Sequence, residues 1–169
     1  MQLTFQDNNK NYSLTNIGMI VATKLLATNE LNIINPHNTY LSLIKNARWI
    51  KGVTPIFSSD YTNLHKGLVE MNIRVQIIVT MAVMNKLTED IDLNILKNLI
   101  DNYDLEIFVT NENPKVAFTA TDSVLSFGLF NNNGVYDITQ DLISTDKMGI
   151  RWGCELFEYY LGKAKRYKI

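Results

Sequence analysis

Polar side chains that could bind a small molecule follow each of three strands predicted to be parallel. They are Ser58, Ser59 and Asp60 after the first strand, Thr80 after the second, and Thr110 with Asn111 after the third. Open α/β sheets bind ligands beyond the carboxyl ends of their strands, where helix N-termini offer free amide donors. The same residue types also cap helices routinely. Ligand binding and capping both stay open as interpretations of this set.

A second polar set is predicted on a β-hairpin later in the chain. Side chains alternate across a strand, so Thr119 and Thr121 share one face while Phe118 lies on the other. Asp122 lies in the turn, and Ser126 on the next strand could join the row of hydroxyls. With aromatic neighbours, these groups would suit a pocket for a small, partly apolar molecule. The alternative is a half-exposed edge strand, where Thr is simply a favoured residue.

Signatures of catalysis and of metal binding are missing from the sequence. His37 and His65 lie far apart, and neither has the spacing to a Cys or to the other His that metal sites require. No glycine-rich phosphate loop, Walker sequence or nucleophile elbow is found. The single Cys154 is expected to be a packing residue. The sequence therefore predicts no catalytic residue, no metal and no cofactor.

Composition indicates an ordinary globular chain with no marked affinity for polyanions. The 169 residues suit one compact domain with a small appendage, and 46% hydrophobic with 20% charged residues is typical of folded proteins. With 16 basic and 17 acidic side chains, strong DNA binding by this chain alone is not expected. The longest apolar stretch, Val75 to Met84, is about half the length of a membrane-spanning helix. Because no signal peptide is recognised either, we expect a cytoplasmic protein without a membrane partner.

The first part of the chain is predicted to be the remnant of a winged-helix domain. Leu3–Phe5 and Tyr12–Leu14 flank a polar loop and predict a β-hairpin, and Thr15 is a good N-cap for a helix reaching about Thr28. A hairpin followed directly by a helix is how a winged-helix domain ends, although no recognition helix precedes it. We expect residues 1–30 to be a wing with its connecting helix and residues 31–169 to be an α/β effector domain.

The remainder predicts an α/β fold with a mixed sheet flanked by helices. In chain order the expected elements are a helix from Pro36, strand Trp49–Phe57, helix Asp60–Met71, strand Ile73–Val79, helix Asp92–Asn102, strand Leu105–Val109, strands Val116–Thr121 and Val124–Phe130, a turn at Asn131–Gly134, and a last helix from Ser144 or Thr145 to about Arg166. The early strands alternate with helices and should pair in parallel through right-handed crossovers. The two later strands are close in sequence and should form an antiparallel hairpin.

The last predicted helix carries more aromatic surface than one side of a sheet needs. Its aromatic residues are Trp152, Phe157, Tyr159 and Tyr160. Gly149 and Gly153 lie one turn apart and would permit close approach of another backbone. Packing on the sheet is the default use of such a face. Part of it is predicted to be a dimer contact, so a homodimer is the expected assembly.

Several segments of the sequence carry a family resemblance. They are Thr54–Phe57, Phe118–Phe130, Gly134–Asp137, Asp141–Ser144 and Trp152–Tyr160. Together they resemble the effector domain of the Fil-type methanogenesis regulatory proteins, which are archaeal winged-helix transcription regulators. The resemblance implies a winged helix, a connecting helix and this α/β domain. The chain departs from that layout because the recognition helix is missing and the connection from Leu26 to Pro36 is short.

The order of elements also resembles phospholipase D folds. Their His-x-Lys signature is absent, because His65 is followed by Lys66 and Gly67. The sequence thus predicts a regulatory module and not an enzyme. An unidentified small-molecule effector would shift a dimer between arrangements and so move an attached, complete winged helix on DNA. The alternative is a purely structural dimerisation or protein-interaction module without a ligand.

Overall fold

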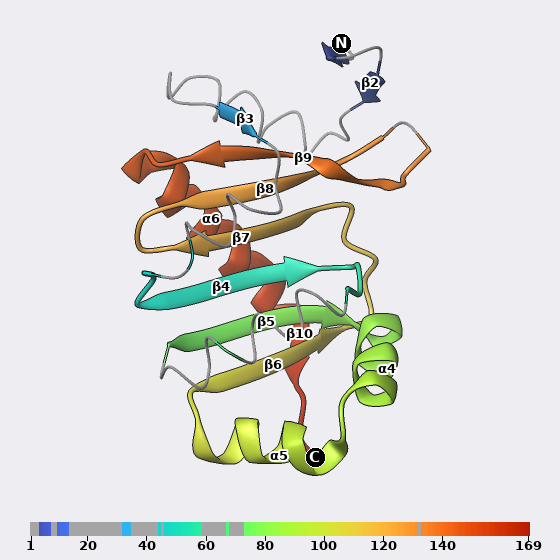
Figure 1. Cartoon of the computed structure of the whole chain (residues 1–169), viewed down its shortest axis with the longest axis vertical. Coiled ribbons are helices and arrows are strands. Elements are labelled where there is room, and N and C mark those ends of the chain that lie inside the picture. Colours follow the sequence, from blue (N-terminus) through green and yellow to red (C-terminus); the bar gives the residue numbers. More distant parts are fainter. Residues whose placement is uncertain are drawn as a thin grey trace.

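A mixed sheet of eight strands in the order β10-β6-β5-β4-β7-β8-β9-β3 forms the body of the protein (Figure 1). The computed structural model describes residues 4–7, 10–13, 32–34, 44, 46–58, 67, 73–131 and 133–169. The strands of this sheet are β3 (Asn32–Ile34), β4 (Trp49–Thr54), β5 (Arg74–Thr80), β6 (Leu105–Thr110), β7 (Ala117–Thr121), β8 (Leu125–Phe130), β9 (Tyr136–Ser144) and β10 (Ala164–Arg166). The described helices are α4 (Met81–Asp90), α5 (Leu93–Asn102) and α6 (Lys147–Leu161).

Parallel and antiparallel pairing divide the sheet in the way the sequence predicts. Strand β5 pairs in parallel with β4 and β6, whereas β4 with β7, β7 with β8 and β8 with β9 are antiparallel. Helices cover both faces of β5, and its Val75, Ile78 and Val79 are buried. The predicted fold class, a mixed sheet flanked by helices, is confirmed.

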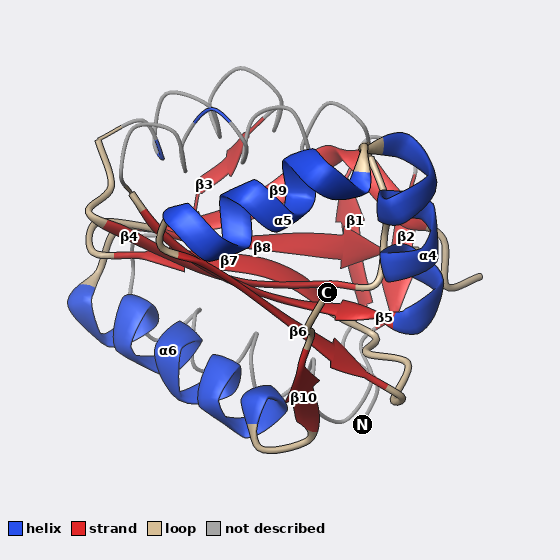
Figure 2. Cartoon of the chain, turned by 90° about the horizontal axis from the view of Figure 1, so that it is seen from below, coloured by secondary structure: helices blue, strands red, loops and turns tan. Residues whose placement is uncertain are grey.

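Helices cover the two faces of the sheet separately. Seen along the sheet, α6 lies on one side, and α4 with α5 lie on the other (Figure 2). Side chains alternate along each strand, so Ile50 of β4 joins the core beneath α4 and α5 while Val53 joins the core beneath α6. The sheet therefore has two apolar cores, and each face can be considered by itself.

Some predicted boundaries were wrong because helix and strand signals merge. The predicted strand Ile73–Val79 is found as β5, but helix α4, which begins directly after it at Met81, was not predicted. The Thr80 hydroxyl caps this helix by accepting a hydrogen bond from the amide of Val83 at 3.2 Å. The predicted strand Trp49–Phe57 ends at Thr54. The next residue is a proline, which has no amide hydrogen to continue the ladder.

The C-terminal region contains two strands that were not predicted. Ser144 does not cap the last helix, because it ends β9 and pairs with Leu125; the cap is Asp146, whose carboxylate accepts from the amides of Met148 and Gly149. The last helix stops at Leu161, and β10 then pairs with β6. Local spacing could not show this pairing, since the partner strand lies far back in the sequence.

At the N-terminus, β1 (Thr4–Asp7) and β2 (Lys10–Ser13) form an antiparallel pair, as the predicted hairpin requires. Whether this pair is a wing stays a prediction. The helix predicted after Thr15 lies outside the described residues. The helices predicted from Pro36 and over 60–71 do so too, except for Ile44 and Gly67, which are helical, and Ile44 is buried as expected. Among the described helices, none has the length and apolar character needed to cross a membrane.

We predict that α6 tolerates no side chain at Gly153. A Cβ there would lie 2.6 Å from Cδ1 of Leu125 and 3.3 Å from Cβ of Ala120, both fully buried. Gly153→Val should lower the free energy of unfolding by about 1–3 kcal/mol. A matched Gly162→Val variant, whose Cβ meets only ordinary contacts at 3.7 Å, should change it by about 0.5 kcal/mol or less. Urea titrations followed by circular dichroism measure both values, and equal losses would contradict the close approach.

Candidate functional site

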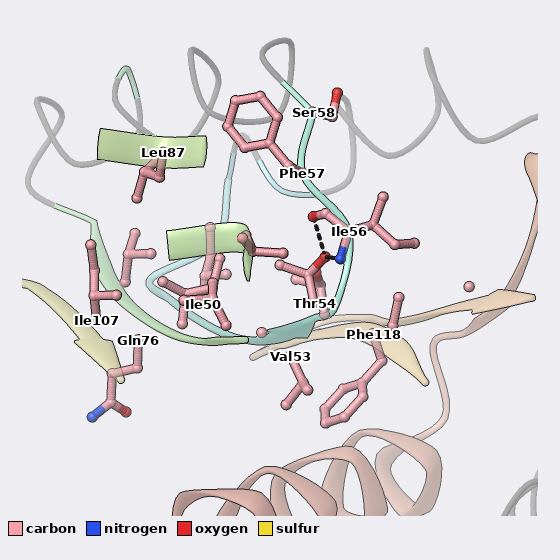
Figure 3. Close-up of a pocket in the computed structure, with 18 of the residues that line it drawn as sticks. Ile50, Val53, Thr54, Ile56, Phe57, Ser58, Gln76, Leu87, Ile107 and Phe118 are labelled. Atoms are coloured by element: carbon pink, nitrogen blue, oxygen red, sulfur yellow. Dashed lines mark hydrogen bonds between the residues drawn. The ribbon is translucent and has the colours of Figure 1, made fainter. Parts of the chain in front are cut away.

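A cavity of about 140 Å³ lies on the face of the sheet that α4 and α5 cover (Figure 3). Its floor is made of positions with little or no side chain: Gly52 on β4, Ala117 on β7 and Gly128 on β8. Gly52 is paired with Ile77 on one side and Thr119 on the other, and Ala117 is paired with Gly128. A glycine inside a strand often marks a place where a ligand approaches the backbone closely. Here the small residues of neighbouring strands leave a shared hollow.

The walls of the cavity are largely apolar. Ile50 and Leu87 point into the space above the strands, whereas Val53 and Phe118 point to the opposite side, toward α6 (Figure 3). The other apolar lining residues come from β5, β6, α4, α5, the link between these helices and the segment after β4: Ile56, Phe57, Val75, Ile77, Val79, Val83, Ile91, Leu96, Leu99, Leu105 and Ile107. Such a lining favours an apolar body in any molecule that enters.

A buried carboxyl, Asp141 on β9, also lines this cavity. Only 4% of its surface is exposed, and two hydroxyls donate to it: Oγ of Ser126 to Oδ2 at 2.8 Å, and the phenol of Tyr136 to Oδ1 at 3.3 Å. A register shift between β8 and β9 after Gly128 lets Tyr136 fold back over that glycine. A Cβ at Gly128 would overlap the Tyr136 ring. The glycine thus makes room for the Tyr136 side chain beside the carboxyl.

Burial raises the pKa of the Asp141 carboxyl above its ordinary value. The hydrogen bonds from Ser126 and Tyr136 lower this pKa, because they favour the charged form, while the nearby charge of Asp137 raises it. Burial outweighs the hydrogen bonds. This carboxyl consequently holds its proton more tightly than a carboxyl in water, and a ligand that provided a positive charge would reverse the balance.

Comparison with known proteins places the chain in a family of regulators. Residues 33–163 match the family described as the middle domain of methanogenesis regulatory protein FilR1. The chain belongs to the FilR1 middle-domain family. It is also 25% identical over 156 residues to the methanogenesis regulatory protein FilR1 of Methanothrix harundinacea (strain 6Ac). That alignment covers 90% of this chain and 35% of the relative, so the FilR1 middle domain spans about a third of the relative's length.

Three solved structures share the fold of this FilR1 middle domain. TrmBL2, an archaeal chromatin protein, is 12% identical with a TM-score of 0.64, covering 87% of this chain and 60% of that one. Nuc from Salmonella typhimurium, a phospholipase D family member, is 11% identical with a TM-score of 0.60, and the match covers 83% of this chain and 99% of that one. NucT from Helicobacter pylori is 16% identical with a TM-score of 0.57, and the match covers 82% of this chain and 99% of that one. These likenesses show the fold alone.

The structure brings part of the two predicted polar sets together in the FilR1 middle domain. Ser58, from the first set, and Thr119, from the second, line the same cavity. Thr119 is paired with Ser126, so these two hydroxyls share a face as predicted, and Ser126 reaches the cavity through Asp141. Ligand binding by these residues stays a prediction. Ser59 and Asp60 lie outside the described residues.

The other predicted ligand residues have structural partners and do not line the described cavity. Thr80 caps α4, and the Thr110 hydroxyl accepts from the amide of Glu112. The Thr121 hydroxyl accepts from the amides of Ser123 and Val124, which fixes the β7–β8 turn. Asp122 accepts from the amide and Nε of Arg48 at 3.0 and 2.8 Å. Burial would raise the pKa of Asp122, but the hydrogen bonds and charge of Arg48 hold it below its ordinary value.

Asp141, the most buried charged group of the site, was not among the residues predicted from the sequence. The sequence did contain a signal for a buried carboxyl, since Asp141 directly precedes the apolar pair Leu142 and Ile143. The signal had no structural context because β9 was not predicted as a strand. Without β9, nothing placed this carboxyl on the same face as Ser126 and Gly128.

The four aromatic residues predicted as a dimer contact do not share one environment. Phe157 and Tyr160 are buried against the sheet, with 0% and 4% of their surfaces exposed, so they do not offer a face to a partner. Trp152 is partly buried and packs near Phe127, with ring centroids 6.1 Å apart. Tyr159 is 49% exposed and carries the Lys163 ammonium over its ring. Only Trp152 and Tyr159 keep surface that another chain could contact.

We expect the stability contribution of Asp141 to grow as the pH falls. Its pKa is higher in the folded than in the unfolded chain, so the folded state takes up the proton first and gains stability down to the ordinary carboxyl pKa. The free energy of unfolding of the wild type, minus that of Asp141→Asn, should therefore increase as the pH falls from about 7 to about 4. If the pKa of Asp141 is higher by one in the folded than in the unfolded chain, this difference in the free energy of unfolding increases by about 1.4 kcal/mol.

Denaturant titrations across this pH range measure that difference. Asp90→Asn is the control, because Asp90 is exposed on α4 and does not line the cavity. This control shows how far an Asp-to-Asn change outside the cavity alters the pH dependence. If the free-energy difference for Asp141→Asn shrinks toward low pH, hydrogen bonding and not burial determines the direction in which the pKa of Asp141 is shifted.

Proposed function

We propose that this chain is the ligand-sensing part of an archaeal transcription regulator and that the cavity described above binds its effector. Membership of the FilR1 middle-domain family and the likeness to a regulatory protein make it a domain of a transcription regulator. The step to sensing rests on one observation: an apolar hollow with a buried carboxyl at its edge, on a sheet face floored by Gly52, Ala117 and Gly128. A domain with only a structural role would be expected to fill that space.

The size of the hollow limits what the effector can be. Its volume of about 140 Å³ is close to that of engineered protein cavities of about 150 Å³ that hold benzene. The effector, or the part of it that enters, is therefore about as large as one aromatic ring. The polar groups at the edge, Ser58, Thr119 and Asp141, would orient it.

We propose further that the effector acts on a homodimer and that DNA is contacted through a complete winged helix. A ligand shifts an equilibrium only when it binds one arrangement better than another. Net charge of −1 supports a sensing role for this chain, with little affinity for DNA by itself. The antiparallel β1–β2 pair would then be a wing, with residues 1–30 forming the end of the DNA-binding domain and 31–169 the sensor.

We assign no catalysis to the chain and place it in the cytoplasm, where transcription regulators act. The phospholipase D family likeness extends to the fold, but neither histidine of the sequence begins a His-x-Lys triplet. Asp141 accepts from two hydroxyls, and no nucleophile activated by a general base accompanies it in the described part of the cavity. Binding is the chemistry that this arrangement supports.

The sensing proposal is tested by filling the cavity. A thermal-shift screen with methanogen metabolites and coenzymes should find a compound that raises the melting temperature; at about 100 times its dissociation constant it adds roughly 2.7 kcal/mol. Gly52→Val should abolish that shift. A Cβ at Gly52 meets only ordinary contacts, 3.6 Å to the Phe118 carbonyl oxygen and 3.8 Å to Thr119 Oγ1, and the two methyl groups of valine can extend into the cavity, so the fold should survive.

The matched control is Gly162→Val, which adds the same atoms at the end of α6, away from the cavity. It should keep the full ligand-induced shift. A hit that stabilises Gly52→Val as strongly as the wild type would place binding elsewhere and contradict the proposed site. A screen without any hit would count against sensing itself.

A structural dimerisation module without a ligand is the second candidate, favoured by the exposed stripe on α6. Met148 and Tyr159 are 73% and 49% exposed and lie on one side of this helix with Trp152. If α6 forms the contact, Met148→Ala with Tyr159→Ala should convert dimers to monomers in light-scattering measurements, because truncating central interface residues removes most of the binding energy. Trp152 is left intact since it also packs near Phe127.

Lys147→Ala is the control for that double variant and should leave the dimer intact, because Lys147 is exposed on the same helix but lies about a third of a turn away from Met148 and Tyr159. A dimer that survives the double variant would place the contact elsewhere. A wild type that stays monomeric at high protein concentration would remove both the dimer and this second candidate.

A further inference from the structure

The Asp141 carboxyl has no positively charged partner among the described residues. Its hydrogen bonds come from the two hydroxyls of Ser126 and Tyr136, and none of the described salt bridges includes it. The other carboxyl whose charge acts on it, Asp137, repels a second negative charge. A carboxyl this deeply buried is normally paired with a cation or stays protonated. Among the described residues, the site thus has a negative group and no positive one beside it.

Asp141 also keeps hydrogen-bonding capacity that a ligand could use. An ionised carboxylate has about four acceptor positions, and two hydroxyl donors use one position on each oxygen. Because Asp141 lines the cavity, a molecule inside it can approach the carboxylate without displacing either hydroxyl. These hydroxyl donors would also favour the ionised form once a cation is bound.

The aromatic residues that line the cavity favour a cation inside it. Phe57 and Tyr136 both line the cavity, and the faces of aromatic rings attract ammonium groups. Tyr136 does so from a position that the missing side chain of Gly128 leaves open beside Asp141. The aliphatic walls from α4 and α5 suit the uncharged part of the same molecule.

We propose that the ligand of this cavity is a small organic cation, a primary amine carried on a compact apolar body, with its ammonium group on Asp141. The inference rests on the proposed function and narrows it to a ligand class. An anion would be repelled by the charge of Asp141, which has no cation beside it among the described residues. A neutral molecule of the same shape would leave the carboxyl without a charge partner. The ammonium–carboxylate bond would be charge-assisted and hence stronger than a neutral one.

Three probes of nearly the same shape test the class: benzylamine, benzyl alcohol and benzoate, each with one ring of the size that the cavity admits. We expect benzylamine to bind the full chain with a dissociation constant on the order of millimolar or below, measured by calorimetry. Benzyl alcohol should bind at least about tenfold more weakly and benzoate not at all.

Asp141→Asn should reduce the affinity for benzylamine by at least about tenfold while leaving that for benzyl alcohol nearly unchanged. This difference between two probes separates a lost charge contact from a disturbed fold, which would weaken both. Asp90→Asn, away from the cavity, should bind benzylamine as the wild type does.

The outcomes separate this inference from the proposed function. Equal binding of benzylamine and benzyl alcohol, or stronger binding of benzoate, would overturn the cation assignment and leave the cavity as the sensing site. The cation assignment would also be overturned, and the sensing site kept, if a metabolite bound the wild type but not Gly52→Val while no amine bound. If no probe and no metabolite binds, the inference and the proposed function fall together.

Discussion

Missing side chains on one face of the central strands are the constraint on which the site depends. Gly52, Ala117 and Gly128 lie on neighbouring strands and face the same side, because the register pairs Gly52 with Thr119 and Ala117 with Gly128. A single small residue would leave a gap in the packing that neighbouring side chains could fill. Together, Gly52 and Ala117 leave a hollow in a layer where protein interiors are otherwise close-packed, and Gly128 makes room for the Tyr136 ring at its edge. The backbone ladder stays intact, since glycine and alanine keep their amide and carbonyl groups.

The opposite face of the same strands is filled by large side chains, so the hollow is particular to the face beneath α4 and α5. There, Val53, Phe118 and Phe127 fill the space beneath α6, and the rings of Phe118 and Phe127 stack with centroids 6.0 Å apart. Helix α6 comes close enough that Gly153 carries no side chain. Glycine thus serves different purposes in this fold. Gly153 lets α6 touch the sheet and Gly128 lets the Tyr136 ring approach the strand, whereas Gly52 meets only ordinary contacts and leaves space in the cavity.

Much of this arrangement followed from local patterns, and the remainder depended on distant pairing. The strand around Val75 and the β7–β8 hairpin were predicted from apolar spacing and turn residues, and the shared face of Thr119 and Ser126 followed from alternation alone. In contrast, β9 and β10 are defined by partners whose position the local sequence does not encode. The stretch before Ala164 predicted a continuing helix, although its end pairs with β6. Helix α4 was hidden for another reason, because its first turn continues the apolar run of β5.

The same limit explains which part of the site was found. Ser58 and Thr119 were identified by residue type and position, yet the group that gives the cavity its charge, Asp141, needed the β8–β9 register to be seen. Hydroxyls at strand ends are common and mostly bind their own backbone, as Thr80, Thr110 and Thr121 do. A carboxyl inside an apolar core is rare, since its burial costs stability unless a charge or several donors compensate. Asp141 has two hydroxyl donors and no cation among the described residues, so part of that cost remains in the free protein. A ligand that removed this cost would stabilise the folded sensor through the same contact by which it is recognised.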